Sequence, residues 1–294
     1  MGGIVRHLPP EQRERALAAY RSAVTAKRHR FFLGLTILCI ALGLASVAGE
    51  VDVVKFYSNV HRLPNYLWNI APPLSWATLG GDVAEWFWNL KHWLTLLVDT
   101  LLIAYLGTLL GLIGGFTLCF SATANLEQHR LVRFATRRLL EFCRSVPEIV
   151  FALLFVVAFG LGPMPGVLAL AVHTLGALGK QFAEVAENVD MKPVEGAIAT
   201  GASRILAIRF AVLPQVMSNF ASYTLLRFEI NVRGAAVMGF VGAGGIGQDL
   251  MEAVRKFYYS DVSAILLLII TTVVVIDLVT ERLRHAIIGL EHGR

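Results

Sequence analysis

Charged and hydrogen-bonding side chains interrupt the apolar second half of this chain, and they are the residues best suited to carry chemistry. They are His173 in one stretch and, in a later one, Arg227, Glu229, Asn231 and Arg233. Both stretches are apolar enough to enter a membrane, where an ionisable group costs at least ~2.5 kcal/mol and normally faces a partner or a water-filled path. These side chains therefore indicate one of two roles: they line a route for a polar solute, or they form ion pairs between helices.

The spacing of the later residues divides them into two groups. Glu229 and Arg233 are four residues apart, so on a helix they can form an ion pair. Arg227 shares a helix face with Asn231, away from that pair, and it has no counter-charge nearby in the sequence. Arg227 is therefore the ionisable residue whose partner has to come from another helix or from a ligand.

Two interpretations of Arg227 remain open. In the first, Arg227 binds a passing anion, with His173 or Asn231 as an additional hydrogen-bond donor. Such a site must be weak, because tight binding inside a conduit would block release. In the second, Arg227 pairs with a carboxylate on another span, such as Asp99 or Asp277. The sequence favours neither.

A glycine run follows this stretch and imitates a nucleotide-binding motif. Gly242, Gly244 and Gly247 spell G-x-G-x-x-G, and Asp261 follows at about the distance of a ribose-binding acid. A dinucleotide site also needs a strand, a turn and a helix within a parallel sheet, whereas this run follows a membrane span on its external side. We instead expect the glycines, Gly245 included, to permit a tight re-entrant turn beside the exit of the pathway.

Other catalytic motifs are missing from the sequence. Gly176 to Lys180 resembles a phosphate-binding loop, but Gln181 stands where Ser or Thr is required. The cysteines, Cys39, Cys119 and Cys143, are isolated and indicate neither disulfides nor a metal site. We therefore expect no catalytic residue, no metal and no cofactor on this chain, which leaves a membrane enzyme without a basis.

The composition indicates a membrane protein. The chain has 294 residues, of which 56% are hydrophobic and 16% are charged, and its mean hydropathy is +0.63. Soluble domains carry about 25% charged residues. Six transmembrane helices are predicted: residues 31–49, 100–120, two within 149–179, about 214–234 and about 262–280. The third and fourth are separated by the turn residues 160–166. The predicted fold class is therefore an all-α polytopic membrane protein.

The positions of Lys and Arg predict the orientation of the chain. They gather in the N-terminal tail, in residues 121–145 and 180–210, and after the last span. By the positive-inside rule we expect these segments and both termini to be cytoplasmic. The expected location of the chain is the cytoplasmic (inner) membrane, which it crosses several times. The net charge of +5 is thus a topology signal and does not indicate nucleic-acid binding. A cleaved signal ending near Ala48 is the alternative for the N-terminus, but the apolar run is long for that role.

The chain divides into five predicted regions. They are a basic cytoplasmic tail (1–30), the first transmembrane helix (31–49), an external interfacial segment (50–93), a core domain (94–284) and a second cytoplasmic tail (285–294). The tryptophans lie in or beside the external segment: Trp68, Trp76, Trp86, Trp88 and Trp93. Because tryptophan prefers the interface between lipid and water, we expect these side chains to anchor the segment at the outer surface of the membrane.

The most informative segment lies between the fourth and fifth predicted spans. Its pattern is E-x-A, three residues, G, eleven residues and L-P, formed by Glu195, Ala197, Gly201, Leu213 and Pro214. The pattern resembles the cytoplasmic "EAA" coupling loop of ABC-importer permeases, in which a short helix sits in a groove of the ATPase. Gly196 and Ala211 depart from that pattern, because Ala and Ile are usual there. We expect a coupling helix at about 195–211, small residues that allow close approach of a partner, and Pro214 at the start of the next helix.

Further motifs narrow the resemblance. They are residues 144–147 (R-S-V-P), 213–216 (L-P-Q-V), 227–233 (R-F-E-I-N-V-R) and 241–247 (V-G-A-G-G-I-G). With Glu195-Gly196 they resemble the permease subunit of phosphonate ABC importers. The resemblance covers residues 94–284 and is most specific over 195–247. Permeases for phosphite or other phosphonate-like anions would share these motifs.

The resemblance implies a type I permease fold and a set of partners. A second copy of the chain would pair with the first, with the pathway between them. Two ABC ATPase subunits would bind ATP and Mg and hold the coupling helices, and an extracytoplasmic phosphonate-binding protein would deliver the anion. Two alternatives are a permease for another small solute, and an ion channel or secondary carrier in which Arg227, Glu229 and Arg233 act as a filter or relay.

Overall fold

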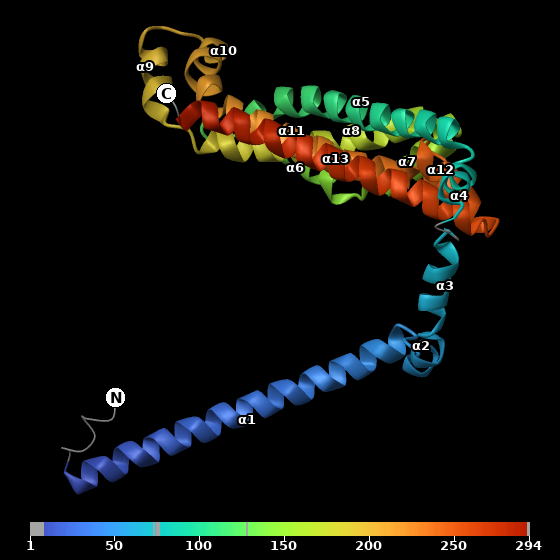
Figure 1. The fold of residues 1–294 in the computed structure, drawn as a ribbon. Coiled ribbons are helices and arrows are strands. Elements are labelled where there is room, and N and C mark those ends of the chain that lie inside the picture. Colours follow the sequence, from blue (N-terminus) through green and yellow to red (C-terminus); the bar gives the residue numbers. More distant parts are fainter. Residues whose placement is uncertain (1–8, 73, 75–76, 128, 293–294) are drawn as a thin grey trace. The chain divides into compact units, whose positions relative to one another are not determined.

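The computed structural model describes residues 9–292, apart from residues 73, 75, 76 and 128 (Figure 1). Helices, turns and loops account for all of these residues, and no strand occurs among them. Trp76 lies outside the described residues. The chain forms two compact units, Met1–Trp68 and Asn69–Arg294, and each is described by itself.

The first unit is dominated by one long helix. Helix α1 spans Pro10–Ala48, and the short helices α2 (Val53–Asn59) and α3 (Arg62–Ile70) follow it. The part of α1 from Leu17 to Ala48 is apolar and long enough to cross a membrane. The helix begins at Pro10, well before the predicted start of the first span at residue 31, so residues 10–30 of the basic tail and the span form one continuous helix.

The second unit is a bundle of long helices with short helices at each end (Figure 1). Its elements in order are α4 (Leu79–Trp86), α5 (Leu90–Ala122), α6 (Arg130–Ser145), α7 (Glu148–Phe159), α8 (Pro163–Glu187), α9 (Met191–Ala199), α10 (Arg204–Ala207), the π-turn η2 (Ile208–Val212), α11 (Leu213–Met238), the 3-10 turn η3 (Gly239–Val241), α12 (Ile246–Arg255) and α13 (Tyr259–His292). Helices α9 and α10 lie at the same end as the last residues of α13, and α4 and α12 lie at the other end.

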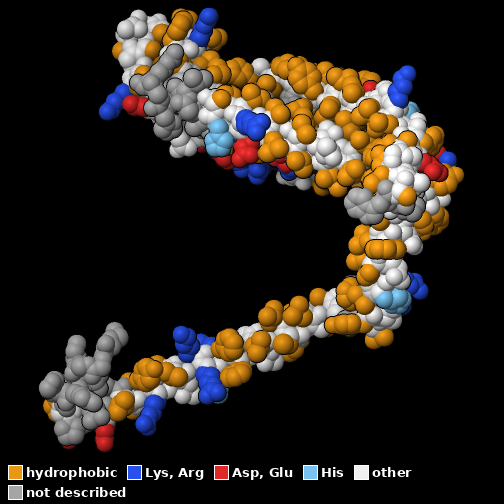
Figure 2. Space-filling model, viewed as in Figure 1, with side chains coloured by type: hydrophobic (Ala, Val, Ile, Leu, Met, Phe, Trp, Pro, Cys, Tyr) orange, Lys and Arg blue, Asp and Glu red, His pale blue; other side chains and the backbone are white. Residues whose placement is uncertain are grey.

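Four helical segments of the described chain are long and apolar enough to cross a membrane. They are Leu17–Ala48, Leu90–Ala122, Arg204–Val241 and Tyr259–Ile287. Helices α6 and α7 pass the same test as a pair bent by 88°. Hydrophobic side chains cover most of the visible sides of the long helices in both units (Figure 2). With α8 at the centre of the bundle, this arrangement is consistent with six crossings.

Helix α8 is central because glycines on α5 let it approach closely. A Cβ on Gly107 would lie 2.6 Å from the Cβ of Leu170, and one on Gly111 would lie 2.5 Å from the Cβ of Thr174. These glycines are four residues apart, as in membrane helix pairs that pack through small residues. Neighbouring helices cover much of α8, so it needs less apolar surface than the lipid-facing helices.

The region of the third predicted span contains two helices. Residues 130–145, expected on the cytoplasmic side, form α6 and pack on α8, where a Cβ on Gly176 would lie 2.7 Å from the Cβ of Cys143. Helix α7 has 12 residues and is about 18 Å long, which is too short to cross the membrane alone. The chain bends between them because Val146, which precedes Pro147, is extended. Helix α7 therefore meets the test for a span only together with α6, as a bent pair.

The described tryptophans of the second unit contact other protein groups. The indole N–H of Trp86 donates to the Ser263 hydroxyl (3.0 Å), and that of Trp88 donates to the Asp261 carboxylate (3.0 Å). Trp93 is buried in the core, with 2% of its surface exposed. These residues tie α4 and α5 to the start of α13. The anchoring role expected for the five tryptophans stays a prediction, and Trp86, Trp88 and Trp93 also link helices of the bundle.

Candidate functional site

A buried polar cluster connects α5, α8 and α11. The side-chain amide of Asn231 donates to the hydroxyls of Thr108 (2.8 Å) and Thr174 (2.9 Å). Asn231 is 1% exposed, and its Oδ1 atom has no hydrogen-bond partner in the described part of the chain. Because unsatisfied buried polar groups destabilise a protein, this oxygen is a place where a water or ligand donor would be favourable.

Arg227 joins the same cluster from one helical turn earlier. Its Nε lies 3.4 Å from the Thr174 hydroxyl, and its Nη2 donates to Nδ1 of His173. The other ring nitrogen of His173, Nε2, lies 3.2 Å from the carbonyl oxygen of Arg144. Arginine can only donate, so Nδ1 of a neutral ring is the acceptor and Nε2 carries the hydrogen. The expected common face of Arg227 and Asn231 is therefore observed.

The carboxylate closest to this pair is one that the sequence interpretation did not consider. Oε2 of Glu148 lies 3.4 Å from Nδ1 of His173. Asp277, proposed as a partner of Arg227, instead binds Arg233. Glu148 directly follows the R-S-V-P motif and is the first residue of α7, with Pro147 as the N-cap. This motif was the sequence signal that could have pointed to Glu148. Thr108 and Thr174 were missed because nothing in the sequence distinguishes them from other threonines inside spans.

A second network of charges joins α11 to α13. The predicted Glu229–Arg233 ion pair is present, and Nη2 of Arg233 also binds both carboxylate oxygens of Asp277 at 3.0 Å. Oε2 of Glu229 lies 3.4 Å from Nη2 of Arg284 and 3.4 Å from the hydroxyl of Thr280. The side chain of Arg233 is 48% exposed on the surface of this single chain. A half-exposed charge within a span requires water or a partner protein beside it.

A cavity of about 420 Å³ lies between the start of α7 and the second half of α11. It is lined by Pro147, Glu148, Ile149, Ile230, Arg233, Gly234, Val237 and Met238. Gly234 lies beside the carboxylate, since a Cβ at that position would be in van der Waals contact with Oε1 of Glu148 at 3.5 Å. The cavity thus combines one carboxylate and one guanidinium with an otherwise apolar lining.

The glycine run forms a tight turn between η3 and α12. Gly242, Gly244 and Gly245 have φ angles of 82°, 86° and 79°, a region that other residues rarely adopt. A Cβ on Gly247 would collide with the carbonyl oxygen of Ala236. The N–H of Ile246 is held by the Thr100 hydroxyl (2.9 Å). These glycines allow close packing of backbone segments, and no strand lies beside them in the described chain, so the nucleotide motif is a coincidence of spacing.

The segment with the coupling pattern is not one helix, contrary to expectation. Helix α9 ends at Ala199, and the next helical stretch starts at Arg204. Gly201 lies in the turn between them with a φ angle of 87°, so its glycine is required by the backbone conformation. Gly196 is different: it lies within α9, and a Cβ there would meet nothing within 4 Å.

Pro214 lies in the first turn of α11, as predicted. The π-turn η2 directly precedes α11, so the helical stretch continues from Arg204 to Val241 without a break. Proline has no N–H and its ring collides with the carbonyl oxygen four residues earlier. A π-turn directly before it relieves both problems by displacing that part of the hydrogen-bond ladder.

The surface of this segment combines exposed apolar side chains with contacts to the bundle. Ile198, Ile205 and Phe210 are 55%, 77% and 67% exposed. Exposed apolar side chains of this kind indicate an interaction surface. Ala197 is partly buried against the core on the opposite side.

An ion pair connects this segment to the loop between α5 and α6. Nη1 of Arg204 lies 2.8 Å from Oε2 of Glu127, and Nη2 of Arg204 donates to the carbonyl oxygen of Phe120 (3.1 Å). The backbone N–H of His129 donates to Oε1 of Glu127 (2.9 Å). This N–H and then Arg204 lower the pKa of Glu127 below its usual value. Movement of α10 would therefore also move this loop.

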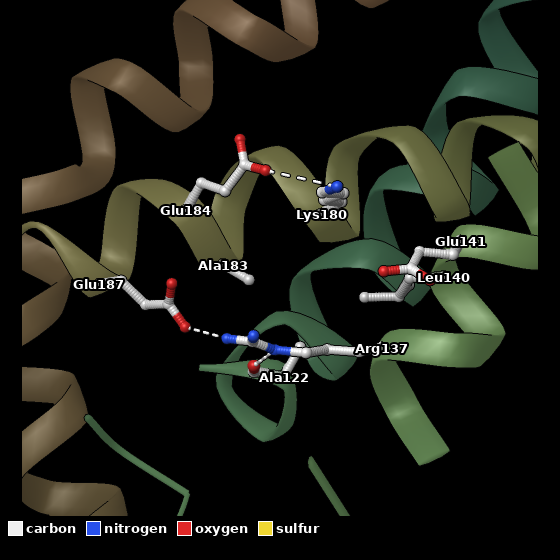
Figure 3. A pocket seen from close by; sticks show the side chains of 8 residues that line it. All are labelled: Ala122, Arg137, Leu140, Glu141, Lys180, Ala183, Glu184 and Glu187. Atoms are coloured by element: carbon white, nitrogen blue, oxygen red, sulfur yellow. Dashed lines mark hydrogen bonds and ion pairs between the residues drawn. The ribbon is translucent and has the colours of Figure 1, made fainter. Parts of the chain in front are cut away.

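A crevice of about 220 Å³ lies nearby, between α6, α8 and the end of α5 (Figure 3). Arg137 forms an ion pair with Glu187 across it, and Nε of Arg137 donates to the carbonyl oxygen of Ala122 (2.7 Å). Oε1 of Glu187 also accepts from the N–H of Ala124 (2.6 Å). These contacts fasten the ends of α5, α6 and α8 to one another.

Helices long and apolar enough to cross a membrane, charges in their interior and an exposed helical segment at one end are features expected of a membrane transport subunit. The family comparison gives its class more closely. Residues 107–288 match the model of the family described as "Binding-protein-dependent transport system inner membrane component". The chain belongs to this family. It is a multi-pass inner-membrane subunit of an importer and not an enzyme.

Relatives with similar sequences are permeases for phosphorus oxyanions. The chain is 43% identical to the phosphite transport system permease protein PtxC of Stutzerimonas stutzeri, over 93% of this chain and 94% of that protein. It is 50% identical to the putative cryptic phosphonate transport system permease protein PhnE2 of Escherichia coli K12, over 40% of this chain and 96% of that protein. It is 40% identical to the phosphate-import permease protein PhnE of Mycolicibacterium smegmatis, over 66% of this chain and 36% of that protein.

Solved ABC importers have the same fold. A chain of the MetNI methionine ABC transporter, in inward-facing form, is similar with a TM-score of 0.56 and 18% identity, covering 66% of this chain and 95% of that one. A bacterial transporter that imports alginate gives a TM-score of 0.59 and 13% identity, covering 90% and 99%. The expected ABC-importer permease fold is therefore confirmed.

Proposed function

We propose that this chain carries phosphite or a related phosphonate across the inner membrane as the permease of an ATP-driven importer. Two arginines held within the spanning helices, Arg227 and Arg233, are the observation that carries the proposal. An oxyanion needs such donors along its route, and a guanidinium matches its oxygens. The sequence relatives that transport phosphite and phosphonate support the choice of anion.

The proposed complex contains two copies of this chain and two ABC ATPase subunits, with ATP and Mg bound by the ATPases. An extracytoplasmic binding protein delivers the anion to the external side. The pathway passes between the two copies and includes His173, Arg227, Glu229, Asn231 and Arg233. The half-exposed side chain of Arg233 supports this arrangement. A charge within a membrane span is costly unless a second copy of the chain or a water-filled path lies beside it.

The coupling surface of the proposal is formed by α9, the turn after it and the helical stretch that follows, with Glu195, Gly196, Ala197, Gly201, Leu213 and Pro214. An ATPase that closes on ATP would push this surface and favour the alternate conformation of the permease. The helical stretch from Arg204 to Val241 is continuous, so a push near Arg204 is transmitted toward Arg227 and Arg233. The same stretch leads into the glycine turn formed by Gly242, Gly244, Gly245 and Gly247, which we place beside the external exit.

Arg227→Ala tests the pathway assignment. We expect uptake of phosphite into vesicles that contain the permease, its ATPase and its binding protein to fall about tenfold or more, since a hydrogen bond to a charged group contributes about 1.5–3 kcal/mol. The complex should still assemble. Arg282→Ala, at an exposed position near the end of α13, is the matched control and should retain uptake. Uptake at the wild-type rate in Arg227→Ala would remove Arg227 from the route.

A further inference from the structure

The cavity between α7 and α11 presents a hydrogen-bond acceptor and a donor to the same space. Glu148 and Arg233 both line it, yet no ion pair joins them in the described part of the chain. Glu148 lies beside His173, and Arg233 binds Glu229 and Asp277. Opposite charges that share a cavity without pairing leave room for a ligand between them.

The carboxylate of Glu148 lacks a donor from its protein neighbour. Nδ1 of His173 accepts a hydrogen bond from Arg227, so in the neutral ring this nitrogen has no hydrogen for Glu148. The side chain of Glu148 is 33% exposed, toward the cavity that it lines. An ionised carboxylate only accepts hydrogen bonds. A ligand that brings a hydroxyl hydrogen would therefore satisfy it.

The guanidinium of Arg233 has donors to spare. Its bonds to Glu229 and Asp277 all leave from one nitrogen, Nη2. A guanidinium carries five N–H donors in a fixed fork, so donors on Nη1 and Nε remain for a ligand that reaches the cavity. Charged oxygens of an anion are the partners that this fork binds best.

The rest of the lining is apolar, so a ligand that fills the cavity also needs an apolar part. Ile149, Ile230, Val237 and Met238 offer no polar side-chain atom to a ligand apart from the weakly accepting sulfur. A suitable ligand thus has charged oxygens, one hydroxyl and one apolar substituent. A singly protonated phosphonate or phosphite has all three, in its P–O⁻, P–OH and P–C or P–H bonds. A sulfonate of the same shape lacks the hydroxyl and would place an oxygen against the carboxylate.

We propose that Glu148 is a specificity-determining residue, which accepts a hydrogen bond from the hydroxyl of a singly protonated phosphorus oxyanion while Arg233 binds its other oxygens. This inference rests on the proposed function and deepens it by naming the protonation state that the pathway selects. A site built to bond a substrate hydroxyl discriminates against an analogue without it, because the polar group of the site is then left unpaired.

Methylphosphonate and methanesulfonate form a matched pair of probes for this proposal. At mildly acidic pH both carry one negative charge, one methyl group and three oxygens, and they differ by the hydroxyl hydrogen. The full permease–ATPase complex is placed in lipid nanodiscs without binding protein, so that only the pathway selects. Phosphorus NMR line broadening reports methylphosphonate binding, and methanesulfonate is added as the competitor.

The wild-type complex should bind methylphosphonate about tenfold or more tightly than methanesulfonate. In Glu148→Gln the difference should shrink to about threefold or less, because the amide can donate to a sulfonate oxygen. Glu281→Gln, an exposed glutamate on α13, is the control and should keep the wild-type ratio. Glu148→Asp retains the carboxylate and should keep the discrimination with weaker binding, which covers the case in which Glu148→Gln does not assemble.

Unchanged discrimination in Glu148→Gln, loss of discrimination in Glu148→Asp, or no broadening with the wild-type complex would each overturn the proposal. ATP-driven uptake of phosphite by the wild-type importer is measured in parallel. Normal uptake together with one of these results removes only the role of Glu148. Absence of uptake removes the proposed function itself.

Discussion

At the scale of residues, the interior charges form two groups with different roles. Glu229 and Arg233 pair as their spacing predicts, and they extend to Asp277 on α13. Arg227 instead reaches His173 on α8. The four-residue pairing could be predicted because it depends on one helix only. The partners of Arg227 could not, because they depend on how α8 and α7 pack against α11.

The ion pair of Glu127 with Arg204 makes the stability of the bundle end that carries α9 and α10 depend on pH. The pKa of Glu127 is lowered, so its ionised form stabilises the fold at neutral pH, and this contribution is lost as the pH falls from the usual value of 4.5 through the lower folded value. Glu127→Gln should therefore lower the melting temperature at pH 7, and the difference from wild type should shrink toward pH 4. Thermal melting of the purified permease measures both.

Glu281→Gln is the reference for this experiment, because its carboxylate is 60% exposed and surface ion pairs contribute little. It should melt like the wild type at each pH. An equal loss of melting temperature at pH 7 and pH 4 in Glu127→Gln would show that the charge of this carboxylate does not stabilise the link between α10 and the preceding loop.

At the scale of elements, periodicity and hydropathy predict the long helices but not their interruptions. The spans that became α5, α11 and α13 follow from apolar runs. Helix α6 was missed because its arginines resemble those of a cytoplasmic loop, whereas Gly176 and Gly179 on α8 provide the surface on which it packs. The break after Ala199 was missed because the need of Gly201 for a positive φ angle is a property of the three-dimensional turn.

Helix α9 supplies the sharpest test of the coupling surface. Gly196→Trp places a large ring on its exposed side without backbone strain, unlike a substitution at Gly201. We expect the permease to remain in the membrane while co-purification of the ATPase falls about tenfold or more, since overpacking at an interface costs about 1–3 kcal/mol. Gly80→Trp, on α4 at the opposite end of the bundle, has equal space and is the control. ATPase recovery equal to wild type in Gly196→Trp would contradict the docking of the ATPase on α9.

At the scale of the whole molecule, the proposed functions fall on different parts of the second unit. Helices α4 and α12, with the glycine turn before α12, lie at one end of the bundle, and α9 and α10 lie at the other (Figure 1). The paired charges of α8 and α11 belong to the long helices between these ends. Continuity of the helical stretch from Arg204 to Val241 connects them. The order of these parts along the chain could be predicted from the sequence, because the coupling pattern, the charged residues and the glycine run follow one another between residues 195 and 247. The position of the cavity depends on α7, whose bend could not be read from the sequence.

The central claim is that an ATPase drives transport through this permease. Its most direct test is uptake of phosphite into vesicles that contain the permease, the ATPase and the binding protein, with and without ATP on the ATPase side. We expect uptake with ATP, and none when ATP is absent or when the ATPase is left out. Uptake at the same rate without the ATPase would contradict this claim, and would identify the chain as a channel or a secondary carrier.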